Sequence, residues 1–103
     1  MAEYRRVYTT DIPPSEVLDL AEAYLVGLRG FSVPLGHEPT QNSAEFRLRV
    51  GFLAALFGGH PAVKLATEKR GAKTRLAITA NRKQLLEAMD AWASGELGAT
   101  PSG

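Results

Sequence analysis

Residues 61–80 constrain the fold most, because two runs of alternating apolar side chains flank the dipeptide Gly71-Ala72. A glycine at the first position of a two-residue loop favours the type II′ turn that joins antiparallel strands. Counting outward from Arg70 opposite Lys73 then places the large apolar residues of both runs on one face. The predicted pairs are Glu68 with Arg75, Thr67 with Leu76, Leu65 with Ile78, and Val63 with Ala80. A shift of one residue would mix the faces, so the turn and the hydrophobic pattern predict the same register.

Two amphipathic helices are predicted, over residues 15–29 and 82–94. The first has one apolar stripe at helical spacing, formed by Leu18, Ala21, Leu25 and Leu28. The second follows Asn81, which is a favourable N-cap and has Gln84 three residues later in a capping-box arrangement. Gly95 is expected to end this helix.

Further strands are predicted over residues 3–10, 31–35 and 44–50. The clearest alternation puts Ala44, Phe46, Leu48 and Val50 on one side and Glu45, Arg47 and Arg49 on the other. The element order is therefore β-α-β-β-β-β-α. It predicts an α+β two-layer sandwich, with a mainly antiparallel sheet of four to five strands and two helices on one face. Whether the first strand lies at the centre or the edge of the sheet stays open.

The chain has 103 residues and a net charge of +1, and 45% of its residues are apolar. These values predict one domain over residues 1–97, followed by a flexible tail at 98–103. Cysteine is absent, which excludes disulfides, thiolate metal sites and a cysteine nucleophile.

Without a secretory signal or a long apolar run, we expect a cytoplasmic protein. The low content of Asn, Gln, Met and Cys would suit a thermophile, and GC-rich coding would give the same bias.

The segment 51–59 has no polar side chain and is bounded by glycines. It carries four large apolar residues, Phe52, Leu53, Leu56 and Phe57. Burying each of them is worth roughly 1.5–3 kcal/mol, so exposure to water without a partner is unfavourable. The segment is therefore part of the monomer core, a surface for self-association or a partner protein, or a lid over an apolar ligand.

Charge is distributed unevenly along the chain. Residues 45–83 contain nine basic and two acidic side chains, whereas the remaining residues contain three basic and nine acidic ones. Alternation places four of the basic residues on the sheet face away from the helices, namely Arg47, Arg49, Lys64 and Arg75. Such a face is a candidate surface for nucleic acids or other polyanions. Single-strand readers also expose aromatic side chains for base stacking, and only Tyr4, Tyr8 and Phe52 are available for that role.

No catalytic or metal-binding motif is present. His37 and His60 lack a metal-ligand spacing, and no serine lies in a G-x-S-x-G motif. The acidic residues Glu16, Asp19 and Glu22 fit a solvated helix face. We therefore predict no catalytic residue, metal or cofactor. The predicted function is a non-catalytic domain that self-associates and binds a partner or an apolar ligand through 51–59. The alternatives are polyanion binding on the basic face and a small enzyme with a pocket between sheet and helices.

Overall fold

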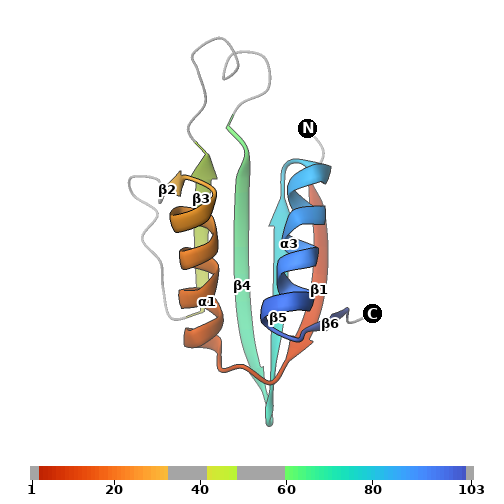
Figure 1. Ribbon diagram of the computed structural model, residues 1–103. Coiled ribbons are helices and arrows are strands. Elements are labelled where there is room, and N and C mark those ends of the chain that lie inside the picture. The colour runs from red at the N-terminus through yellow and green to blue at the C-terminus, as the bar shows by residue number, and fades with distance from the viewer. Residues whose placement is uncertain (1–2, 33–41, 49–59, 102–103) are drawn as a thin grey trace.

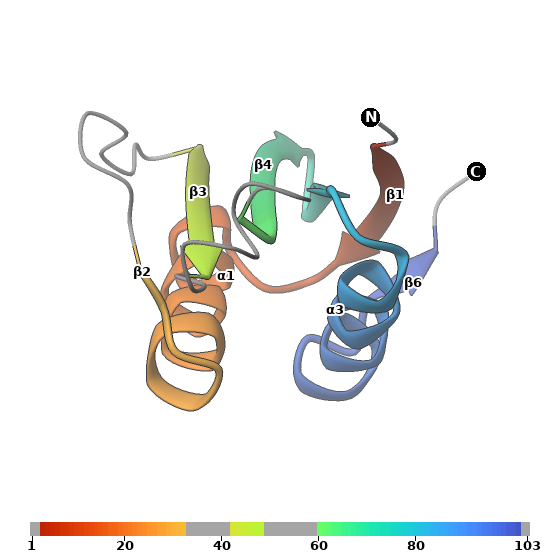
Figure 2. The same cartoon turned by 90° about the horizontal axis from the view of Figure 1, so that it is seen from above.

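The computed structural model describes residues 3–32, 42–48 and 60–101. They form one six-stranded sheet in the order β2-β3-β4-β5-β1-β6, with every neighbouring pair antiparallel. Both helical segments lie on the same face of this sheet (Figures 1 and 2). The elements are β1 (Tyr4–Thr10), α1 (Pro14–Glu22), η1 (Ala23–Leu28), β2 (Phe31–Ser32), β3 (Ser43–Leu48), β4 (Ala62–Arg70), β5 (Lys73–Ala80), α3 (Lys83–Glu96) and β6 (Thr100–Pro101). The predicted α+β two-layer sandwich is confirmed, with six strands instead of four to five.

The hairpin of β4 and β5 has the predicted register at every pair, from Arg70 opposite Lys73 to Val63 opposite Ala80. Gly71 has a φ of +61°, while Ala72 does not have a positive φ. This sign pattern is that of a type II′ turn, which needs the left-handed region at its first central residue.

The strand that the sequence analysis did not predict is β6. It pairs with the outer side of β1, where Tyr8 lies opposite Pro101 and Thr9 opposite Thr100. The chain reaches this position because Gly98 turns it back after α3 with a φ of +57°. The Thr10 hydroxyl also donates a hydrogen bond of 2.8 Å to the carbonyl of Leu97. β1 therefore lies between β5 and β6.

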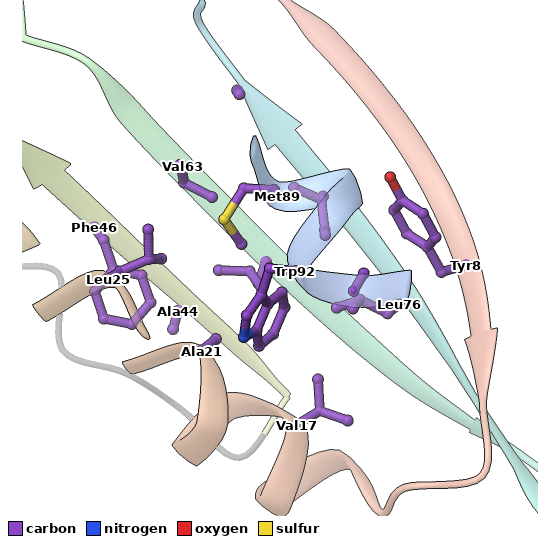
Figure 3. Close-up of a cluster of buried hydrophobic side chains, with 14 of the residues drawn as sticks. Tyr8, Val17, Ala21, Leu25, Ala44, Phe46, Val63, Leu76, Met89 and Trp92 are labelled. Atoms are coloured by element: carbon purple, nitrogen blue, oxygen red, sulfur yellow. The ribbon is translucent and has the colours of Figure 1, made fainter. Parts of the chain in front are cut away.

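The core lies between the sheet and the two helical segments (Figure 3). Its fully buried large side chains come from both layers: Tyr8, Val17, Leu25, Phe46, Val63, Leu65, Leu76, Ile78 and Met89. The two helical segments meet through Tyr24 and Trp92, whose rings stack with centroids 5.7 Å apart. Trp92 is 5% exposed, so this aromatic pair closes the core between the helices.

The helix predicted over 15–29 changes its geometry after Glu22. Residues 23–28 form the π-helix η1, whose i to i+5 hydrogen bonds widen each turn relative to an α-helix. Each residue of η1 therefore turns by a smaller angle about the helix axis than in an α-helix, and the side chains of residues 23–28 turn progressively away from the predicted stripe. Leu25 is fully buried, but Leu28 is 80% exposed. The prediction that Leu28 belongs to the buried stripe is wrong for this reason.

The predicted ends of the second helix are also corrected. Its N-cap is Arg82, without a side-chain capping bond. The Asn81 side chain instead accepts a 2.9 Å hydrogen bond from the amide of Ala62 and donates one of 2.8 Å to the carbonyl of His60. α3 also continues through Gly95, because Gly98 provides the positive φ that turns the chain.

Candidate binding site on the open sheet face

The sheet face opposite the helices is called the open face here. Strand alternation defines it, since the intervening residues of the same strands point to the helix side, where the buried positions of each strand lie. No helix in the described ranges covers it (Figure 2). Its side chains are Arg5, Val7, Thr9, Ser43, Glu45, Arg47, Ala62, Lys64, Ala66, Glu68, Arg70, Lys73, Arg75, Ala77 and Thr79.

The register brings polar side chains of four strands into one row. Glu45 lies opposite Lys64, Lys64 opposite Thr79, and Thr79 opposite Arg5. This row therefore runs from β3 to β1 and places an acid, an amine, a hydroxyl and a guanidinium side by side.

A shallow depression of about 380 Å³ lies beside this row. Its floor includes Ala66 and Ala77, which face each other across β4 and β5. An alanine side chain extends only one carbon from the sheet, whereas Lys64 and Arg5 beside it are long. The face is therefore hollowed at small residues and edged by two cations. The complete lining is Arg5, Ser43, Ala44, Glu45, Lys64, Leu65, Ala66, Ala77 and Thr79.

Ion pairing leaves this face with excess positive charge. The carboxylate of Glu45 is 3.2 Å from the guanidinium of Arg47, and that of Glu68 is 3.1 Å from Arg70. Lys73 is 2.7 Å from the carboxylate of Asp11. The remaining cations of the face are Arg5, Lys64 and Arg75, and none of them has an ion-pair partner among the residues that the structure describes. They lie on three adjacent strands, β1, β5 and β4, and are available to an anionic ligand.

The structure places the predicted polyanion-binding residues Arg47, Lys64 and Arg75 on the open face. Arg49 lies outside the described residues, as do the predicted contact residues Phe52, Leu53, Leu56 and Phe57. Arg5 was not predicted to lie on this face, because Arg5 and Arg6 are adjacent and alternation alone does not say which of them faces the helices. The pairing of Arg5 with Thr79 decides the matter.

Neither described aromatic residue that was considered for base stacking is on the open face. Tyr8 is fully buried on the helix side, and Tyr4 packs against the same core. Phe52 lies outside the described residues. Within the described part of the open face there is therefore no ring on which a nucleic-acid base could stack.

A second polar cluster joins β1 to α3 on the other side of the sheet. The Tyr8 hydroxyl donates a 2.7 Å hydrogen bond to Oδ1 of Asp90, and the guanidinium of Arg6 is 3.3 Å from the same oxygen. Burial, and then the hydrogen bond to Asp90, raise the pKa of Tyr8 to about 12. The hydrogen bond from Tyr8, together with Arg6, lowers the pKa of Asp90. This cluster holds α3 on the sheet.

The structure describes some of the residues considered for a metal or enzyme site. His60 contacts the carbonyl of Leu48 at 3.2 Å, and His37 lies outside the described residues. Glu16, Asp19 and Glu22 are exposed on α1. In the described ranges no three His, Asp or Glu side chains gather closely enough to hold a metal ion. None of the described helices is long and apolar enough to span a membrane.

Comparisons with known proteins relate this chain to others by fold alone. No protein-family model matches it, and no curated protein is similar to it in sequence. The crystal structure of an HSP90 activator from Plasmodium falciparum superimposes with a TM-score of 0.60, covering 99% of this chain and 100% of that one. The two sequences are 15% identical, so the likeness is one of fold.

Proposed function

We propose that this domain is a non-catalytic module that binds an acidic segment of a partner protein on its open sheet face. The observation that carries the proposal is a depression with an alanine floor, edged by Arg5 and Lys64, with Arg75 elsewhere on the same face. None of these three cations has an ion-pair partner among the described residues. Lysine and arginine both bind carboxylates, and arginine can do so through two parallel hydrogen bonds. The small residues between the cations leave room for a peptide backbone to approach the sheet.

Two features favour a protein over a nucleic acid. The described open face has no aromatic ring, and single-strand readers depend on such rings. It also carries Glu45 and Glu68 among its cations, which suits a ligand of patterned charge better than a uniform row of phosphates. The structural neighbour named as an HSP90 activator acts on another protein, which supports a protein partner for this fold.

Charge reversal at Lys64 is expected to weaken binding of an acidic peptide. Lys64→Glu turns an attraction at the edge of the depression into a repulsion, and we expect a loss of about ten-fold in affinity for oligoglutamate at low salt. Arg5→Glu should have a similar effect. Fluorescence anisotropy with labelled oligoglutamate, at two salt concentrations, measures both.

The matched control is Lys83→Glu, which makes the same charge change at an exposed position of α3 in the helix layer. It should leave the affinity nearly unchanged. If Lys83→Glu and Lys64→Glu weaken binding equally, or if oligoglutamate does not bind, the proposed surface is wrong. Tighter binding of oligouridylate than of oligoglutamate would favour the nucleic-acid alternative, with affinity falling steeply as salt rises.

Self-association through 51–59 is a second proposal, supported by the four large apolar residues of that segment. Its flanks are held together, since the amide of Leu48 donates a 2.9 Å hydrogen bond to the carbonyl of Pro61. Light scattering should show a dimer or larger species that Phe52→Ser/Phe57→Ser converts into a folded monomer. A monomer at every concentration that the double substitution unfolds would assign the segment to the core.

A further inference from the structure

The outer edge of β1 is only partly used. β6 pairs with it at two positions, Tyr8 opposite Pro101 and Thr9 opposite Thr100. Along Tyr4–Val7, no described strand pairs with this side of β1 (Figure 1). Alternate residues of an antiparallel edge strand direct their backbone N–H and C=O groups outward, where another strand can pair with them. The edge already accepts an antiparallel strand at its other end.

A cation lies on each face of the sheet at this edge: Arg5 has no ion-pair partner among the described residues, and Arg6 is paired with Asp90. Arg5 lies on the open face beside the depression, and Arg6 lies on the helix side, where its side chain is 46% exposed next to Asp90. A second copy paired antiparallel about Arg5 would bring two guanidinium groups without ion-pair partners in the described structure opposite each other, which is destabilising. A strand with acidic side chains would instead place opposite charges there.

We propose, resting on the proposed function above, that the acidic segment of the partner binds as an added antiparallel strand along Tyr4–Val7 of β1. Backbone hydrogen bonds to the edge supply affinity, and side chains of the added strand supply specificity. Its alternate side chains lie over the open face, where an acidic one is next to Arg5 and the depression. The edge and the depression therefore form one continuous surface.

Three short peptides of alternating glutamate and valine test this mode on the full chain labelled with ¹⁵N. The first peptide is unmodified. The second is N-methylated at every glutamate, and the third is N-methylated at every valine. N-methylation removes the N–H donors along one edge of the peptide and preserves its charge. An added strand pairs through one edge only. We therefore expect one methylated isomer to lose about ten-fold or more in affinity, while the other binds like the unmodified peptide.

Hydrogen exchange locates the binding site. The unmodified peptide should slow exchange of outward-facing amides within Tyr4–Val7 by about ten-fold or more. An Arg5→Glu variant should lose affinity for the glutamate peptide and gain it for a peptide of alternating lysine and valine. This exchange of preference would place the charged side chain of the ligand next to residue 5.

Each contrary outcome overturns a defined part of the argument. If all three peptides bind equally and the amides of Tyr4–Val7 keep their exchange rates, strand addition is wrong and docking on the open face survives. If none binds, the proposed function fails together with this inference. If the free protein is a dimer with those amides already protected, a second copy occupies the edge and the inference is overturned.

Discussion

Replacing Leu25 with alanine is expected to lower the free energy of unfolding by about 2–5 kcal/mol, because a fully buried leucine leaves a cavity in the core. The same replacement at Leu28 is expected to change it by no more than about 0.5 kcal/mol, because that side chain is 80% exposed. Both residues lie in η1, so their substitutions change helix propensity alike. Urea denaturation of the two variants gives the comparison.

This pair tests the π-helical geometry of residues 23–28 directly. A continuous α-helix would keep Leu25 and Leu28 on one buried stripe, and both substitutions would then be strongly destabilising. A large loss at Leu28 would therefore contradict the structure. The m-value should stay the same in both variants, since neither changes the surface exposed on unfolding to a large extent.

Removing the carboxylate of Asp90 is expected to lower the free energy of unfolding by about 1–3 kcal/mol, because Asp90→Ala leaves the buried hydroxyl of Tyr8 without its acceptor. Tyr8→Phe removes the same hydrogen bond by removing its donor, the Tyr8 hydroxyl. A double-mutant cycle with Tyr8→Phe and Asp90→Ala should show coupling between the two positions. Asp19→Ala, at an exposed position of α1, is the control and should have little effect.

Tyr8 and Asp90 also make the free energy of unfolding depend on pH. The pKa of Asp90 is lower in the folded protein, so its stabilisation is present above the pKa of the unfolded state and is lost as the pH falls through the folded value. The pKa of Tyr8 is raised to about 12, so its stabilisation is present below about pH 10 and is lost between about pH 10 and 12. Thermal unfolding across both ranges should show these losses. The Tyr8→Phe variant should lose less stability between about pH 10 and 12 than the original protein. An unchanged alkaline profile would contradict the attribution of this loss to Tyr8.

Local patterns predicted the hairpin and the alternation of β3 correctly. In the hairpin, the turn residues Gly71 and Ala72 and the apolar positions lie within one short segment, so both constraints act on the same pairs. In β3, burial of Ala44 and Phe46 and exposure of Arg47 follow the predicted faces. These features require no information about the rest of the chain.

Contacts between distant residues decided what sequence patterns could not. Asn81 is a good N-cap by type, but its side chain bridges Ala62 and His60 instead. Tyr8 and Asp90 are 82 positions apart, and nothing in either local pattern links them. Arg5 and Arg6 are distinguished only by the pairing of β1 with β5.

The α+β class, the hairpin register and the faces of its strands follow from the amino-acid sequence, because turn geometry and hydrophobic alternation act over a few residues. The place of β1 within the sheet, the addition of β6 to its edge, and the row of Glu45, Lys64, Thr79 and Arg5 became known from the folded structure. They depend on strand order, which long-range burial and backbone pairing set and which no local pattern encodes.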